Sequence, residues 1–163
     1  MRGFKRLKGG RRYRLEGEVT ASELISFAQV LIGRRFRRGT VLTSSQLTKE
    51  YLSLKISQFH FEVFCAVYLD NQHRVICFEQ LFQGTIDGCA VYPREVLKRA
   101  LELNSAAVIF AHNHPSGIAE PSIADISITK RLKAALDTVD IRVLDHFVVG
   151  GDEVISFAER GLL

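Results

Sequence analysis

The feature that most restricts the fold of this chain is an apolar run that ends abruptly in a polar stretch. Residues 105–111 read SAAVIFA, and residues 112–125 continue as HNHPSGIAEPSIAD. A short, continuous apolar run predicts a strand that is covered on both faces. The histidines, prolines, serine and aspartate that follow would then gather at the end of a buried strand.

The other apolar patterns predict helices and further strands around this one. Thr20 and Glu23 form a capping-box pattern before a helix that ends near Gly33, and a second helix begins at Ser44 or Ser45. Strands are predicted at 61–70, 74–82, 140–150 and 153–157, and helices at 93–104 and 122–136. This order predicts an α/β (α+β) three-layer domain with a mixed central β-sheet flanked by helices.

The length of 163 residues suits one domain with a substantial core. Residues 1–18 contain four glycines among their charges and show no sustained period, so we expect a basic mobile arm. Residues 19–57 are predicted to form an N-terminal helical segment. Because no apolar run nears the ~20 residues that span a bilayer, and no apolar signal region follows the basic start, we expect a cytoplasmic protein without a membrane segment.

Positive charge is concentrated at the N-terminus. Residues 1–38 hold eleven Lys and Arg against three Glu, a net charge of +8, whereas the remaining residues carry −4. The basic residues fall in two clusters, at 5–14 and 34–38. Clusters of this kind can neutralise phosphates, so residues 1–38 are a candidate nucleic-acid-binding segment. The alternative is a solvated tail followed by a charged helix end.

The polar stretch after the buried strand has the composition of a metal site. His112 and His114 are two residues apart on an extended segment, so their side chains share one face and Asn113 points the other way. Two imidazoles and a carboxylate are a common ligand set of catalytic zinc. Asp125, one turn into the next helix, is the favoured third ligand, and Glu120 in the loop is the competitor. Alternatively, Ser122 and Asp125 only cap the helix.

The spacing of these residues resembles a known signature. His112, His114, Pro115, Ser122 and Asp125 follow the pattern H-x-H-P-x6-S-x2-D of the JAMM (JAB/MPN) metalloproteases. The stretches LFQGTIDGCAVYPREVLKRALELNSAAVIFAHNHPSG, PSIADISITKRL and IRVLDHFVVGGDEVISFAERGLL resemble the RadC family of bacterial proteins. The resemblance covers about 58–163, which would form the metal-binding domain. Without a recognisable helix-hairpin-helix region in 1–57, the chain resembles the short RadC-like proteins.

The resemblance implies a JAB/MPN-like, cytidine-deaminase-like architecture and one Zn²⁺ per chain. His112, His114 and Asp125 would hold the ion, with water in the fourth position. Ser122 would donate a hydrogen bond to the attacking water or to the developing oxyanion. Glu62, at the start of a strand, would act as general base, as the glutamate before a core strand does in JAMM enzymes; the alternative is a strand-edge residue. Asp145 and His146 match the RadC pattern, and His146 would either support a ligand or fill the core.

Two functions follow from the resemblance and the charge. The first is a zinc metallopeptidase or isopeptidase that acts on an unknown protein or peptide substrate. The second is a DNA-associated accessory protein, of repair or of a mobile element, that binds through the basic N-terminal segment. A two-histidine, one-carboxylate iron site shares the ligand set, but the order of the ligands argues against it. An HNH nuclease does not fit a contiguous HNH triplet, and a deaminase would need a P-C-x-x-C motif that the sequence lacks.

Overall fold

The computed structural model describes residues 3–7, 12–33, 38–39, 41–42, 44–57, 59–84 and 91–163. The chain divides into two compact units, Met1–Arg35 and Phe36–Leu163. This division differs from the expected one at residue 57, because α2 (Ser45–Ile56) belongs to the second unit and contacts its strands. Between the strand predicted at 74–82 and the helix predicted at 93–104, residues 85–90 lie outside the described residues.

The first unit holds a short hairpin and one helix. Strands β1 (Phe4–Arg6) and β2 (Tyr13–Leu15) pair antiparallel. The Phe27 ring in α1 (Ala21–Gly33) stacks on Phe4 with centroids 3.9 Å apart and meets the edge of Tyr13 at 5.1 Å. The segment expected to be a basic mobile arm thus contains two paired strands, whose aromatic rings pack against the helix.

The start of α1 confirms the capping box. The backbone and hydroxyl of Thr20 donate hydrogen bonds to the Glu23 carboxylate at 2.8 and 2.9 Å, and the Glu23 amide donates back at 3.2 Å. These bonds satisfy amide groups that the first turn of a helix leaves without partners. In the part of the chain that the structure describes, no helix is long and apolar enough to cross a membrane.

The second unit is built on a mixed sheet. Its described strands follow the order β4-β3-β5-β6-β7, in which β5 and β6 run parallel and the other neighbours run antiparallel. The bounds are β3 (Val63–Leu69), β4 (Val75–Gln83), β5 (Ala107–Asn113), β6 (Arg142–Gly150) and β7 (Glu153–Ser156). Because β5 lies between β3 and β6, every one of its residues is buried, as the apolar run predicts.

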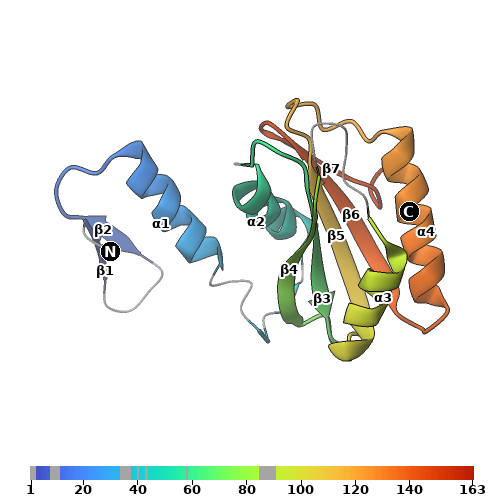
Figure 1. The fold of residues 1–163 in the computed structure, drawn as a ribbon. Coiled ribbons are helices and arrows are strands. Elements are labelled where there is room, and N and C mark those ends of the chain that lie inside the picture. The colour runs from blue at the N-terminus through green and yellow to red at the C-terminus, as the bar shows by residue number, and fades with distance from the viewer. Residues whose placement is uncertain are drawn as a thin grey trace. The chain divides into compact units, whose positions relative to one another are not determined.

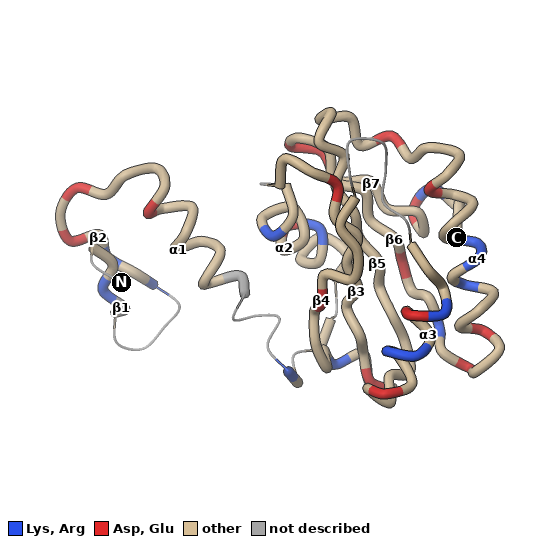
Figure 2. The backbone as a smooth tube through the Cα atoms, viewed as in Figure 1, with Lys and Arg blue, Asp and Glu red and all other residues tan. Residues whose placement is uncertain are grey.

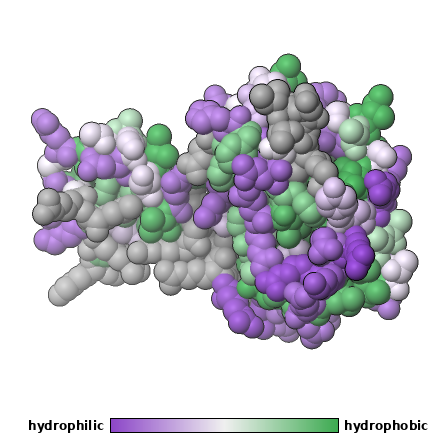
Figure 3. Space-filling model, viewed as in Figure 1, coloured by the Kyte–Doolittle hydropathy of each residue, from purple (hydrophilic) through white to green (hydrophobic). Residues whose placement is uncertain are grey.

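Helices cover both faces of this sheet. Figure 1 shows α2 on one face and α3 (Pro93–Glu102) with α4 (Ile123–Asp137) on the other. The predicted α/β three-layer arrangement is therefore confirmed. Pro93 occupies the first turn of α3, where its missing amide hydrogen costs no bond. Hydrophilic residues gather over α3 in Figure 3, which fits a helix with one face in solvent.

The core beside the metal-site residues lies between the sheet and the pair α3 and α4. Alternate residues of the two central strands, Phe64 and Ala66 of β3 and Val108 and Phe110 of β5, point into it. Helix residues complete it with Val96, Ala100, Leu132 and Leu136. On this face of β5 the next residue after Phe110 is His112, which therefore lies at the edge of this core.

A bulge in β6 changes which of its residues face this core. Val143 pairs with Val108, but the next residue of β5, Ile109, pairs with Asp145. Residues three positions apart lie on opposite faces of a regular strand. The extra residue of the bulge lets both Val143 and His146 face the side of α3 and α4. His146 thereby lies next to Phe110, at the same edge of the core as His112.

We expect the packing of α4 to show in a matched pair of substitutions. Leu132 is 0% exposed, whereas Ile123 of the same helix is 88% exposed. Leu132→Ala should lower the free energy of unfolding by about 2–5 kcal/mol, because it leaves a cavity in the core. Ile123→Ala should change it by less than about 0.5 kcal/mol. Chemical denaturation of both variants measures the difference, and equal values would contradict the assigned packing.

Candidate metal centre

Two histidines meet at the carboxyl end of β5. His112 is its penultimate residue and His114 follows it directly, and their Nε2 atoms lie 3.0 Å apart. Asn113 points away from them, as alternation along a strand predicts. Its side-chain oxygen accepts from the Val63 amide at 2.8 Å, and its nitrogen donates to the carbonyls of Phe59 and Phe61 at 3.2 and 3.1 Å. Asn113 thus holds the segment that leads into β3.

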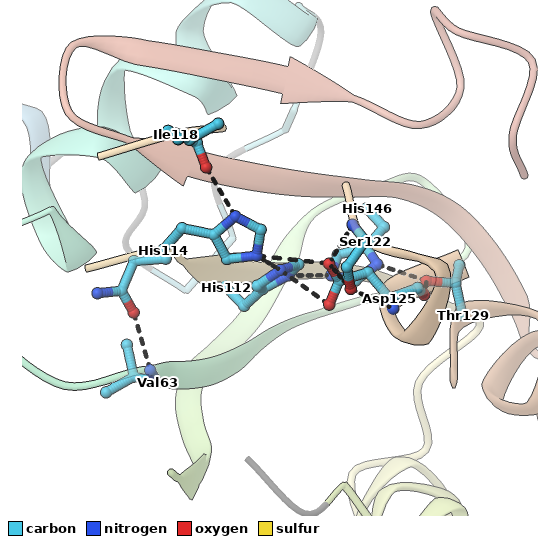
Figure 4. Close-up of polar contacts among 9 residues, drawn as sticks. Val63, His112, His114, Ile118, Ser122, Asp125, Thr129 and His146 are labelled. Carbon is cyan, nitrogen blue, oxygen red and sulfur yellow. Dashed lines mark hydrogen bonds and ion pairs between the residues drawn. The ribbon is translucent and has the colours of Figure 1, made fainter. Parts of the chain in front are cut away.

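The third candidate ligand comes from the first turn of α4. Asp125 places Oδ1 3.2 Å from His112 Nε2 and Oδ2 3.4 Å from His114 Nε2, and Figure 4 shows the three side chains converging. One ligand atom from each lies within 4.8 Å of the others, so this group can hold a metal ion. Glu120, the competing carboxylate, instead forms an ion pair with Arg160 at 2.9 and 2.7 Å.

The same aspartate caps the helix. Its Oδ2 accepts from the amide and the hydroxyl of Ser122 at 2.7 and 2.6 Å, and the Asp125 amide donates to the Ser122 hydroxyl at 3.1 Å. The two readings of the S-x-x-D pattern, helix cap and metal ligand, are therefore compatible for Asp125. For Ser122, the hydroxyl hydrogen is directed at the carboxylate in this arrangement.

The neighbouring polar groups favour an ionised Asp125 carboxylate, although burial opposes its ionisation. Burial alone would raise the pKa of Asp125, but its contacts with the imidazoles of His112 and His114 and the hydrogen bond from Ser122 hold it well below its usual range. The contact with the Asp125 carboxylate raises the pKa of His114, although burial opposes this rise. The side chain of His112 is 1% exposed, and those of His114 and Asp125 are 18% and 13% exposed, so solvent reaches the group from the His114 side.

The outer nitrogen of His114 is fixed by the following loop. His114 Nδ1 lies 2.7 Å from the carbonyl oxygen of Ile118. Because a carbonyl only accepts, Nδ1 carries the hydrogen, and neutral His114 keeps a lone pair on Nε2. That lone pair points at a carboxylate 3.4 Å away, an arrangement that a cation between them would stabilise. The donor set therefore fits a metal ion.

Glycines at the end of β6 let this loop approach closely. A Cβ atom on Gly150 would lie 2.3 Å from the Ala119 nitrogen and 2.5 Å from the Ile118 carbonyl carbon. Such contacts are shorter than any side chain tolerates, so only glycine allows the loop to rest on the strand. The Ile118 carbonyl that orients His114 depends on this contact.

The predicted general base, Glu62, directly precedes β3, whose residues are buried on both faces. Phe64 of β3 pairs with His112 of β5 and the Val63 amide bonds the Asn113 side chain, so the segment that carries Glu62 lies next to the end of β5. The charge of Glu62 contributes, after the contact with Asp125 and other causes, to the raised pKa of His114.

The sequence left the roles of Asp145 and His146 open. Asp145 accepts hydrogen bonds from the His146 amide at 2.7 Å, the Ser156 hydroxyl at 2.6 Å and the Ala158 amide at 3.0 Å. It therefore joins β6 to the turn after β7 and makes no contact with the metal ligands among the described residues. His146 instead lies 2.9 Å from His112, from its Nε2 to Nδ1 of the ligand.

Thr129 was missed by the sequence analysis. Its hydroxyl lies 2.6 Å from His146 Nδ1 and 2.6 Å from the Asp125 carbonyl. A signal for it exists in the sequence, because Thr129 is four residues after Asp125 and so shares its face of the helix.

A family model described as the RadC-like JAB domain matches residues 42–162. The chain belongs to this family. Among similar proteins, the UPF0758 protein of Nitrosococcus oceani is 62% identical over 137 residues, which cover 81% of this chain and 61% of that protein. The UPF0758 protein of Marinobacter nauticus is 58% identical over 139 residues, or 85% and 62% of the two chains. This chain thus spans about three fifths of their length, and the predicted RadC resemblance is confirmed.

We expect Gly150→Ala to disturb the loop. The added methyl group should lower the free energy of unfolding by about 1–3 kcal/mol and displace the Ile118 carbonyl, so affinity for added Zn²⁺ should fall. Gly161→Ala is the control, because its Cβ would meet nothing within 4 Å but its φ of +67° strains any other residue. Denaturation and chelator competition measure both variants. Unchanged Zn²⁺ affinity in Gly150→Ala would show that the loop contact does not orient His114.

Proposed function

We propose that this protein is a zinc-dependent hydrolase of the JAMM type that cleaves peptide or isopeptide bonds. The observation that carries the proposal is the close approach of three side chains: the Nε2 atoms of His112 and His114 lie 3.0 Å apart, and Asp125 places Oδ1 3.2 Å from the first and Oδ2 3.4 Å from the second. Tetrahedral zinc with ligands at about 2.0–2.1 Å separates its ligand atoms by about 3.3 Å. We propose the cytoplasm as the location of the protein.

The chain supplies a carboxylate for proton transfer. When bound, zinc would polarise the scissile carbonyl and lower the pKa of its water from ~15.7 toward ~7. Glu62, whose charge acts on His114, would take the proton and pass it to the departing amine. Asn113 supports this role, because its hydrogen bonds to Phe61 and Val63 fix the backbone on both sides of Glu62.

Ser122 is proposed as the oxyanion donor. Its hydroxyl lies 2.6 Å from Asp125 Oδ2, at the edge of the ligand group, where a substrate oxygen would approach. A hydroxyl rotates at low cost, so its hydrogen would turn from the carboxylate toward the substrate as negative charge develops there. Its contribution to transition-state stabilisation would be about 3 kcal/mol.

We expect Glu62→Gln to separate metal binding from hydrolysis. The variant should keep one zinc per chain and lose hydrolysis by about 10²- to 10⁴-fold, because glutamine cannot accept the proton. Glu120→Gln is the matched control, since this nearby glutamate pairs with Arg160 instead of facing the ligands. Metal analysis and a screen of peptides and isopeptides measure both. Full activity in Glu62→Gln, or absence of metal in zinc-reconstituted wild type, would refute the proposal; iron in its place would point to an oxygenase-type site.

A second candidate function is nucleic-acid binding through the N-terminal unit. Lys5 and Arg14 are cross-strand partners in the β1–β2 hairpin and both are exposed, so they share one face, and Arg12 is exposed beside them. Figure 2 shows basic residues along this hairpin. Glu16 neutralises part of this charge, because it pairs with Lys5 at 3.3 Å. The other residues of the predicted basic clusters, apart from Arg6 and Arg38, lie outside the described residues.

The salt dependence of DNA binding tests this second function. Replacing Lys5, Arg12 and Arg14 together by Gln should reduce the slope of log K against log salt by about three, because each cation that contacts a phosphate releases about one counterion. The control replaces Arg94, Lys98 and Lys133 of α3 and α4 by Gln and should leave the slope unchanged. Absence of binding by wild type at low salt, or equal slopes in both variants, would exclude a role for the hairpin.

A further inference from the structure

His146 has a ring environment that leaves it one orientation. It is 0% exposed, and its ring packs against Phe157 with centroids 4.7 Å apart and against Phe64 at 5.3 Å. Both of its nitrogens have partners: Nε2 lies 2.9 Å from His112 Nδ1, and Nδ1 lies 2.6 Å from the Thr129 hydroxyl. Apolar contacts thus hold the ring, and a polar partner lies at each of its two nitrogens.

These contacts form a hydrogen-bond series from His112 through His146 to Thr129. The positions of its hydrogens follow from Thr129. Thr129 Oγ1 lies 2.6 Å from the Asp125 carbonyl oxygen, which only accepts, so the hydroxyl donates there. Its single hydrogen is then used, and the hydroxyl oxygen must accept from His146 Nδ1. Neutral His146 with a hydrogen on Nδ1 has a lone pair on Nε2.

The hydrogen-bond series also sets the position of the ring hydrogen on His112, a candidate metal ligand. Because His146 Nε2 accepts, His112 Nδ1 donates, and the remaining lone pair of His112 lies on Nε2, the atom that faces His114 and Asp125. Every donor in this hydrogen-bond series therefore has one acceptor.

We propose that His146 and Thr129 are positioning residues that hold the ring hydrogen of His112 on Nδ1 and so keep its Nε2 free to bind the metal. The Ile118 carbonyl does the same for His114 from outside the core. Because the Thr129 hydroxyl donates to the Asp125 carbonyl, the hydrogen-bond series also connects the candidate ligand His112 to the candidate ligand Asp125. The inference rests on the metal site of the proposed function, since only there does the Nε2 lone pair have a use.

If His146 only filled the core, its substitution would change the free energy of unfolding. In a folded variant it would leave the ring hydrogen of His112 on the same nitrogen and the metal affinity unchanged. Partners of metal-bound histidines typically alter metal affinity by about 10- to 100-fold when they are removed. The hydroxyl of Thr129 offers a test that keeps His146 itself in place.

The experiment compares Thr129→Val with Thr129→Ser in the full chain. Valine keeps the volume but removes the acceptor for His146 Nδ1, so the hydrogen should move to His146 Nε2 and drive that of His112 from Nδ1 to Nε2. Zinc affinity, measured by chelator competition, should fall about 10- to 100-fold. Serine keeps the hydroxyl and should retain affinity within about threefold of wild type. Thermal unfolding identifies loss of fold in either variant.

Nitrogen-15 NMR of the histidine rings in metal-free protein gives a second readout. Wild type and Thr129→Ser should show the His112 hydrogen on Nδ1, and Thr129→Val should show it shifted toward Nε2. The inference is overturned if wild-type His112 carries its hydrogen on Nε2, or if folded Thr129→Val matches wild type in both ring state and zinc affinity. A wild type that binds zinc but hydrolyses nothing would refute the proposed activity and leave this result intact.

Discussion

The burial of β5 on both faces is the constraint on which the fold and the candidate metal centre depend. A strand without access to water must pair its backbone groups on both edges, and β3 and β6 provide those pairs. The same pairing brings the start of β3 next to His112 and places His146 of β6 beside Phe110. The positions of the two strand histidines, His112 and His146, therefore follow from hydrogen bonds that the core requires in any case.

Features encoded by neighbours in the sequence could be predicted from it. The apolar run of β5, the Pro93 start of α3 and the cap at Ser122 each depend on residues within about one turn or one strand, and the structure has them where the pattern indicates. The orientation of His112 and His114 follows from strand alternation alone. Most elements of the second unit and the candidate metal ligands could be predicted from the sequence for this reason.

Features that depend on distant residues could not be predicted in this way. The ion pair of Glu120, the competing carboxylate, is formed with Arg160, which lies forty positions along the chain. The N-terminal hairpin forms against Phe27, and a bulge that no local pattern marks turns His146 toward His112. In each case the deciding contact joins segments whose proximity only the fold establishes.

The double use of Asp125 has a consequence for how chains of this kind diverge. The carboxylate that faces the two histidines also accepts both hydrogen bonds from Ser122 at the first turn of α4. A descendant that had lost both histidines, and with them its ion, would still gain from keeping the serine and the aspartate for the sake of the helix. Retention of that pair is therefore weak evidence for a surviving enzyme, and the histidine pair is the more informative trace of ancestry.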